Sequence, residues 1–361
     1  MPSIPPPATG LSRRQLLQLA GGSGVALLAR GILSGGAARG AVSGAGRAGP
    51  LPDLPPRGDR RLVAISDLNG PYGSTSYLGE VHRAVALIPA LAPDLVLCGG
   101  DMVAGQKQGL SAGQLAAMWA AFDRQLLIPL RRAHLPFALT LGNHDASGSR
   151  SAGRYSFALD RQEAERFWRP RRDRLGLRFV DGSRFPFAYS VLQNDLFLLV
   201  WDASAAQLPA EQLAWAERSL ASSAAQGARA RLVLGHLPLQ PIAQGRSRPT
   251  EVLQQAEALQ RLLERHNVAA YISGHHHAFF PGRSGSLDLL ALGALGHGPR
   301  RLLGSTQPPR HTLTLIDMFW GRSGQPARRV YTSYDITSLR RIQPDELPES
   351  VVTPAGRVIR R

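Results

Sequence analysis

Five short polar motifs follow apolar runs along this 361-residue chain, and each combines a glycine with a carboxylate, amide or imidazole side chain. They are Asp67-Leu68-Asn69-Gly70, Gly99-Gly100-Asp101, Gly142-Asn143-His144-Asp145, Gly235-His236 and Gly274-His275-His276-His277. Carboxylate and amide oxygens together with imidazole nitrogens suit Mn²⁺, Fe or Zn²⁺, and the motifs hold no thiolate that would favour a soft metal. The residue types therefore predict a site for divalent metal ions.

Each motif comes directly after a run of residues typical of a β-strand. The five runs are Leu62–Ser66, Leu95–Cys98, Phe137–Leu141, Arg231–Leu234 and Ala269–Ile272. Ligand sites in α/β sheets form beyond the carboxyl ends of the strands, where loops converge. Taken singly, a motif such as Asp-Leu-Asn-Gly could be an ordinary turn. The recurrence of polar groups at five strand ends instead predicts that they meet in one site.

The elements that must position these motifs alternate between strand and helix patterns. Further strands are expected at 187–191, 196–201, 287–292, 312–318 and 330–334, and helices at 77–90, 111–132, 160–169, 209–224 and 250–266. Three of the helices begin at N-cap or N1 signals, Ser76, Ser111 and Pro209. This alternation is typical of βαβ units and predicts an α/β fold. Ten strands and five helices favour two packed sheets with helices outside.

The motif series resembles that of the calcineurin-like metallophosphoesterases. In that family the order is Asp-x-His, Gly-Asp, Gly-Asn-His-Asp/Glu, a lone His, and Gly-His-x-His, and the resemblance covers about residues 61–300. The resemblance implies a four-layer fold, in which a two-sheet β-sandwich is flanked by helices. It also implies two divalent metal ions at the edge of the sheets.

The resemblance assigns a ligand to each motif position. Asp67 and His277 would bind the first metal, and Asp101 would bridge the two ions. The second metal would be held by Asn143, His236 and His275. His276 falls at the variable position of the last motif, so we expect it to be structural.

The same resemblance implies hydrolysis of phosphomonoester or phosphodiester bonds by a metal-activated hydroxide. Paired metal ions neutralise charge and clamp the attacking and leaving oxygens of an in-line displacement. His144 would lie beside the leaving group and donate a proton or a hydrogen bond to it. Asp145 would be its catalytic neighbour, and Asn143 would also contact the substrate. No Ser or Cys nucleophile motif supports a covalent route.

The first motif departs from the family because Asn69 stands where a histidine is expected. Asn69 either binds the first metal through its amide oxygen or contacts neighbouring groups or the substrate instead. If the first site is weakened, the chain could be a catalytically weak protein that binds metal or a phosphorylated ligand. After Asp101 the chain continues Met102-Val103-Ala104, without the tyrosine of purple acid phosphatases or the Asp-Arg of protein Ser/Thr phosphatases.

Two further substrate contacts are predicted outside the motifs. His297 follows the strand pattern at 287–292 and could face the substrate. The segment Gln240–Pro249 carries Arg246 and Arg248 and could recognise phosphate, because guanidinium groups pair well with phosphate oxygens. The alternative for this segment is a solvated loop.

The formal charge of +16 raises the question of nucleic-acid binding. The chain has one lysine, Lys107, and 41 arginines that are scattered along its length. The densest cluster, Arg169 to Arg174, has no interleaved aromatic residues on which bases could stack. A nuclease is therefore an alternative, but we expect a small phosphorylated substrate rather than nucleic acid.

The N-terminal 45 residues read as an export signal. Arg13-Arg14 precede a moderately apolar stretch from Leu16 to Leu33, and small residues follow. This order is typical of a signal peptide, and the paired arginines resemble the twin-arginine type. The apolar stretch contains glycines and Arg30, which makes it too weakly apolar for a stable membrane span.

The signal predicts a periplasmic or secreted bacterial protein that is a substrate of the twin-arginine export machinery and has no membrane span once mature. We expect a Gly/Pro-rich linker over 46–60, a metallophosphoesterase domain over 61–345 and a C-terminal tail over 346–361.

Overall fold

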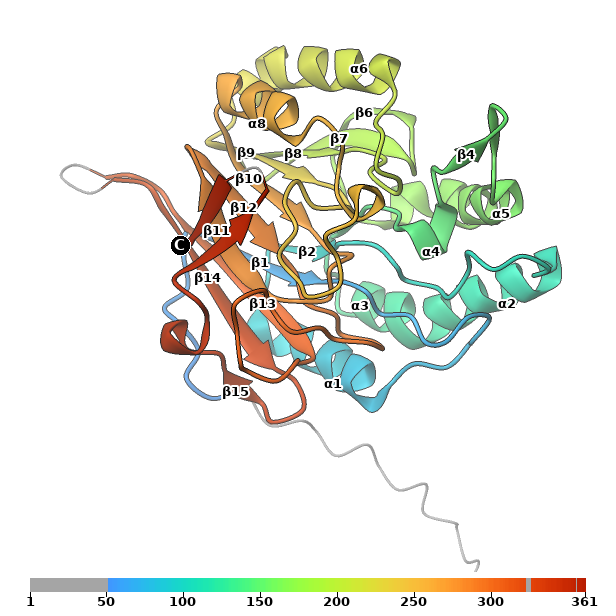
Figure 1. The fold of residues 1–361 in the computed structure, drawn as a ribbon, viewed down its shortest axis with the longest axis horizontal. Helices are drawn as coiled ribbons and strands as arrows, with labels where there is room; N and C mark the ends of the chain where they lie inside the picture. The colour runs from blue at the N-terminus through green and yellow to red at the C-terminus, as the bar shows by residue number, and fades with distance from the viewer. Residues whose placement is uncertain (1–50, 323–325, 355) are drawn as a thin grey trace, which may run out of the picture. The chain divides into compact units, whose positions relative to one another are not determined.

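Two β-sheets, of six and nine strands, carry all five motifs (Figure 1). The computed structural model describes residues 51–322, 326–354 and 356–361. The α/β class with two sheets flanked by helices, expected from the sequence, is confirmed. The export signal predicted over residues 1–45 lies outside the described residues.

The six-stranded sheet brings the first three motifs to one edge. Its parallel strands are β1 (Arg60–Ile65), β2 (Leu95–Cys98) and β3 (Phe137–Leu139). Every residue of β2 and β3 is buried, as expected for parallel strands covered on both faces. Because parallel strands end at the same edge, the loops after them meet there. On the other side of β1 run the antiparallel strands β13 (Thr312–Phe319), β14 (Arg328–Asp335) and β15 (Arg340–Arg341).

The nine-stranded sheet supplies the two histidine motifs. Its parallel strands are β8 (Leu196–Val200), β9 (Ala230–Leu234), β10 (Val268–Ser273) and β12 (Leu287–Ala291). The outer strands are β6 (Phe179–Arg184), β7 (Ala188–Gln193), β11 (Phe280–Ser284), β16 (Ser350–Thr353) and β17 (Gly356–Arg360). A separate small hairpin consists of β4 (Arg150–Ser151) and β5 (Arg154–Tyr155).

Alternation along β8 separates two apolar layers. Leu198 and Val200 belong to the main core with the six-stranded sheet, whereas Phe197 and Leu199 belong to a second cluster with the outer helices. Successive side chains of a strand point to opposite faces, so β8 serves both layers. The second cluster packs against α6 (Ala210–Ala221) and α8 (Ala256–Arg265), which Figure 1 shows on the outer face of the nine-stranded sheet.

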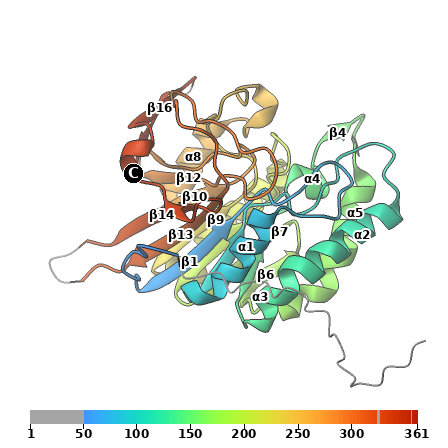
Figure 2. The ribbon, with the colours of Figure 1, turned by 90° about the horizontal axis from the view of Figure 1, so that it is seen from below.

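Helices also cover the outer face of the six-stranded sheet (Figure 2). They are α1 (Gly79–Leu87), α2 (Ala112–Phe122), α3 (Ile128–Arg132) and α5 (Ala158–Trp168). The remaining short helices are α4 (Asn143–Ala146), α7 (Ser223–Gln226) and the 3₁₀ segments Ile88–Leu91, Arg169–Arg174, Pro249–Glu251 and Pro344–Glu346. In the part of the chain that the structure describes, no helix has the length and apolarity needed to cross a bilayer.

The helix pattern at 111–132 forms one helical run with an irregular middle. Ser111 caps α2, because its hydroxyl accepts from the Gln114 N–H while the Gln114 side chain accepts from the Ser111 N–H. A π-helical turn, Asp123–Leu127, joins α2 to α3. Ser76, by contrast, does not cap α1, whose N-cap is Leu78.

Both ends of the domain differ from the sequence expectation. The last residues, expected as a tail over 346–361, form the hairpin β16–β17, and β17 pairs with β11. Val351 and Val358 are buried on that sheet, which explains why the segment is ordered. Within the expected linker over 46–60, Leu51 is buried and Arg57 forms an ion pair with Asp94 at 2.9 Å. The described part of the linker therefore packs onto the domain.

Candidate metal centre

The loops at the strand ends turn sharply at the predicted ligands themselves. Asp67, Asp101, His275 and His277 have φ values of 53°, 52°, 64° and 56°. This left-handed conformation is uncommon for residues other than glycine and clusters at functional sites, where the surrounding structure maintains it. Four predicted ligands thus share this backbone conformation, which residues outside the site such as Ala92 and Asn194 also adopt.

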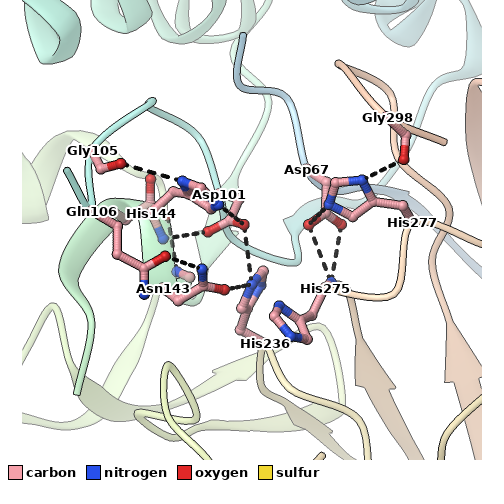
Figure 3. Close-up of polar contacts among 12 residues, drawn as sticks. Asp67, Asp101, Gly105, Gln106, Asn143, His144, His236, His275, His277 and Gly298 are labelled. Carbon is pink, nitrogen blue, oxygen red and sulfur yellow. Dashed lines mark hydrogen bonds and ion pairs between the residues drawn. The ribbon is translucent and has the colours of Figure 1, made fainter. Parts of the chain in front are cut away.

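One set of converging side chains, the second-metal group, consists of Asp101, Asn143, His236 and His275. The ligand atoms of Asp101, His236 and His275 lie within 4.8 Å of one another. His236 Nδ1 lies 2.7 Å from the Gly99 carbonyl oxygen, so this nitrogen carries the proton. Its Nε2 therefore faces Asp101 Oδ2 at 3.3 Å and Asn143 Oδ1 at 3.0 Å (Figure 3).

The other set, the first-metal group, consists of Asp67, Asp101 and His277, whose ligand atoms again lie within 4.8 Å of one another. His277 Nε2 lies 3.3 Å from Asp67 Oδ1, and its Nδ1 lies 2.8 Å from the Gly298 carbonyl oxygen. A Cβ atom at Gly274 would lie 2.7 Å from Asp67 Oδ2, so only glycine leaves room for that carboxylate. Asp101 belongs to both groups, which is the position required of a bridging carboxylate.

Asn69 borders the first-metal group. Its backbone N–H donates to the Asp101 carbonyl at 3.1 Å, and its own carbonyl accepts from the His297 N–H at 3.1 Å. The residue is 7% exposed. Ligation by its amide oxygen stays a prediction.

The buried acids and imidazoles stabilise each other's charged forms. Burial alone would raise the pKa of Asp101, but the facing imidazoles of His236 and His144 outweigh it and hold that pKa well below its usual value. Burial would likewise lower the pKa of His236, but the Asp101 carboxylate outweighs it and raises that pKa to about 9. For Asp67, the neighbouring His277 similarly outweighs burial and lowers the pKa. A divalent cation would displace the proton held between Asp101 and His236 and would take over its role.

His144 and Asp145 point in different directions. Both lie on the single-turn helix α4, where consecutive side chains are about 100° apart. His144 Nδ1 lies 3.3 Å from the Gly105 carbonyl oxygen, and its Nε2 lies 4.0 Å from Asp101 Oδ2. The Asp145 carboxylate instead accepts three backbone hydrogen bonds, and it is not paired with the His144 ring. The donors are the N–H groups of Met102 (2.8 Å), Val103 (2.9 Å) and Gly142 (2.9 Å).

Asp145 therefore holds the Asp101 loop against the Asn143 loop. The residue is 1% exposed. Burial and the Asp101 carboxylate raise the pKa of Asp145 to about 8, against the lowering effect of the N–H groups of Gly142 and Val103. The hydrogen bonds of Asp145 hold the ligand loops in place, whereas the sequence predicts a catalytic role for Asp145 beside His144.

A residue that the sequence analysis did not single out, Glu251, lies beside the second-metal group. Its Oε2 is 3.0 Å from His275 Nε2, and its backbone carbonyl is 2.9 Å from His276 Nε2. His276 is fully buried and its Nδ1 accepts from the Ile242 N–H at 3.2 Å, in agreement with the structural role expected for it. Burial lowers the pKa of His275 to about 4, so this imidazole is neutral at pH 7 and has a lone pair for a metal.

A cavity of about 830 Å³ opens beside the second-metal group. Asn143, His144 and His275 line it. The other lining residues include Tyr72, Arg150, Tyr155, Arg246 and Glu251. Of the two further substrate contacts predicted, Arg246 lines this cavity, whereas His297 does not and is exposed near Asn69.

The donor set fits the metals expected from the sequence. Each group combines carboxylate oxygen with imidazole nitrogen, and Asn143 adds an amide oxygen, which is the mixture that Mn²⁺, Fe and Zn²⁺ accept. The five motifs follow strand ends at one edge of a two-sheet sandwich, and Asp101 belongs to both ligand groups there.

A sequence profile of the calcineurin-like phosphoesterases matches residues 60–279, more than half of the chain. The chain belongs to the calcineurin-like phosphoesterase family. No curated protein sequence matches it. The family match covers all five motifs and confirms the resemblance on which the ligand assignment rests.

Solved structures resemble the chain at low sequence identity. A purple acid phosphatase from yellow lupin (Lupinus luteus) seeds is 14% identical with a TM-score of 0.55, over 79% of this chain and 52% of that one. This chain therefore spans about half the length of the phosphatase. A putative 5'-nucleotidase from Staphylococcus aureus is 12% identical, with a TM-score of 0.44 over 79% of this chain and 56% of that one. At 14% identity the likeness to the purple acid phosphatase concerns the fold alone.

Proposed function

We propose that this protein hydrolyses small phosphomonoesters or phosphodiesters with two divalent metal ions. The observation that carries the proposal is the pair of ligand groups that share Asp101, beside a cavity that Asn143 and His275 line. Asp67 and His277 would hold one ion. The other ion would be held by Asn143, His236 and His275. When bound, the two ions would lower the pKa of a water molecule and clamp the attacking and leaving oxygens.

The protein's own side chains would orient the ester. Because His144 Nδ1 faces the Gly105 carbonyl, Nε2 is the ring nitrogen left for the ester, and in the doubly protonated imidazolium it would donate a hydrogen bond or a proton to the leaving oxygen. The His144 N–H also donates to Asp101 Oδ1 at 2.8 Å, which fixes the orientation of the bridging carboxylate. Phosphoryl transfer needs mainly positioning and charge stabilisation, and these contacts supply both.

The cavity supports a small substrate. Pockets of about 300–1,000 Å³ are typical of small-molecule sites, and the volume beside the second-metal group lies in that range. Arg150 and Arg246 line the cavity beside the acidic residues Asp202, Glu211 and Glu251, and their guanidinium groups would pair with phosphate oxygens.

The test is turnover by metal-stripped protein supplied with Mn²⁺, Fe²⁺, Zn²⁺ or Mg²⁺ on generic phosphomonoesters and phosphodiesters. We expect turnover that requires added metal and that Asp101→Asn abolishes. Asp123→Asn is the control, because Asp123 pairs with Arg171 and contacts neither ligand group. Protein that binds metal but turns over no ester with any of these ions would contradict the proposal and point to a metal-binding or phospholigand-binding protein.

We further propose that the protein is exported through the twin-arginine route. The support is the order of Arg13-Arg14, an apolar stretch and small residues in the N-terminal sequence. That route carries folded proteins, so the metal centre would form before export.

A further inference from the structure

Glu251 is the acidic residue with the most side-chain partners beside the second-metal group. Its side chain is 8% exposed and lies at the end of the 3₁₀ segment Pro249–Glu251. Oε2 accepts from His275 Nε2 at 3.0 Å and from Arg246 Nη1 at 2.5 Å. Oε1 accepts from Arg248 Nη2 at 2.8 Å. Both carboxylate oxygens are therefore occupied.

The contact with Glu251 decides which nitrogen of His275 can bind a metal. A carboxylate only accepts hydrogen bonds, so Nε2 carries the proton in a neutral imidazole and Nδ1 carries the lone pair. Nδ1 is then the ring atom available to the ion shared with Asp101 and His236. Metal-binding histidines generally donate their second N–H to a carboxylate or carbonyl, which fixes the ring and raises its basicity. His236 and His277 use the carbonyls of Gly99 and Gly298 for this purpose, and His275 alone of the three uses a carboxylate.

The backbone around Glu251 prevents the carboxylate from turning away. Its carbonyl accepts from His276 Nε2, and His276 Nδ1 accepts from the Ile242 N–H. The loop that carries Glu251 is thus tied at two points to the residue next to His275. The end of β10, which carries His275, therefore also sets the position of the Glu251 carboxylate.

Two arginines keep the buried carboxylate ionised. The side chain of Arg246 is 18% exposed and that of Arg248 is 77% exposed, so Arg246 is the partner that lies within the protein. A buried anion without such partners would be costly. Arg246, the predicted phosphate contact, also lines the cavity. The Glu251 carboxylate therefore contacts both Arg246 and the predicted metal ligand His275.

We propose that Glu251 is a positioning residue that fixes the ring orientation and tautomer of His275 and thereby sets the metal affinity of the second-metal group. The proposal rests on the proposed function, because it requires His275 to bind a metal. It concerns one ion only, since His275 belongs to the second-metal group and not to the first.

The experiment titrates metal-free protein with Zn²⁺ and with Mn²⁺, and compares wild type with Glu251→Ala and Glu251→Gln. We expect wild type to bind two ions, and Glu251→Ala to weaken one of them by about 10- to 100-fold while leaving the other unchanged. Glu251→Gln retains the volume and one acceptor oxygen but not the charge, so we expect a smaller loss at the same site. Glu163→Gln is the matched control, because Glu163 is a buried, ion-paired glutamate on α5 that contacts no predicted ligand.

Circular dichroism of each variant shows whether the fold is retained, and Glu251→Gln decides the question if Glu251→Ala does not fold. A folded variant that binds both ions with wild-type affinity overturns the proposal. Equal weakening of both ions also overturns it, because that result indicates general loosening of the site. Wild-type protein that binds two ions but hydrolyses no ester contradicts the proposed function and leaves the role of Glu251 to be decided by the titration.

Discussion

Asp145 provides a quantitative test of how the ligand loops are supported. Its side chain accepts hydrogen bonds from three buried N–H groups, those of Met102, Val103 and Gly142. A buried donor that loses its partner costs about 1–3 kcal/mol. Replacement by alanine removes all three bonds, so we expect Asp145→Ala to lose about 3–9 kcal/mol of the free energy of unfolding. That loss is comparable to the total stability of many domains, about 5–15 kcal/mol.

Asp145→Asn is the more informative change because it keeps the shape of the side chain. Both carboxyl oxygens accept in either protonation state, whereas an amide nitrogen cannot accept. Whichever way the amide lies, at least one of the three N–H groups faces another donor. We therefore expect Asp145→Asn to lose about 1–3 kcal/mol, equivalent to one buried unpaired donor.

Urea unfolding of the metal-free variants, followed by circular dichroism, measures these losses. Asp123→Asn again serves as the control, since it removes one partly exposed ion pair, and we expect a change within about 1 kcal/mol. If Asp145→Asn unfolds at the wild-type urea concentration but hydrolyses esters more slowly, the supporting role is refuted. The catalytic role predicted from the sequence would then be the better description.

Two further predictions concern residues that the sequence singled out. Asn69→His should shift the metal preference of turnover from Mn²⁺ or Mg²⁺ toward Zn²⁺ or Fe²⁺, because imidazole replaces a harder amide oxygen; an unaltered profile across the four metals would count against Asn69 as a ligand. Changing Arg13 and Arg14 together to lysine should block export in a bacterial host with the twin-arginine machinery, whereas the wild-type chain should reach the periplasm with its N-terminus cut at about residues 38–46. Fractionation and mass spectrometry measure both, and equal export of the two chains would exclude the twin-arginine route.

The strands of the sheet interior could be predicted because each is a short apolar run ended by glycine or polar residues. β2 has the predicted bounds, and its four residues are all buried. The strands that were missed lie toward the sheet edges and mix polar with apolar residues. β6 contains Asp181 and Gly182, and β16 and β17 extend over only four and five residues. Such short alternation cannot be separated from irregular chain without the neighbouring strand β11.

The sequence predicts those parts of the site whose ligands directly follow a strand. Asp67, Asp101, His236 and His275 follow strands whose carboxyl ends meet, so their convergence follows from the order of the strands. Glu251 could not be found in this way, because its partner His275 lies 24 residues away and only the folded loop joins them. In that region the sequence singles out only the arginines of the Gln240–Pro249 segment, and it predicts that they contact phosphate.

Adjacency in sequence does not bring the side chains of His144 and Asp145 into contact. His144 and Asp145 are neighbours in the motif, but on the helix their side chains point about 100° apart. A motif therefore predicts which residues belong to the site, but it does not predict which of their side chains are in contact.

Because its ligands come from both sheets, the metal centre can be complete only after the two sheets have packed together. The His275 backbone N–H donates to Asp67 Oδ1 at 3.1 Å, although the two residues are 208 positions apart in the chain. Neither sheet alone holds a complete group, because carboxylates come from one sheet and imidazoles from the other. A nascent chain can acquire tight metal binding only after its last ligand strand, β10, has docked. A metal ion bound between the six-stranded and nine-stranded sheets would link them. It would therefore slow those unfolding steps in which the two sheets separate.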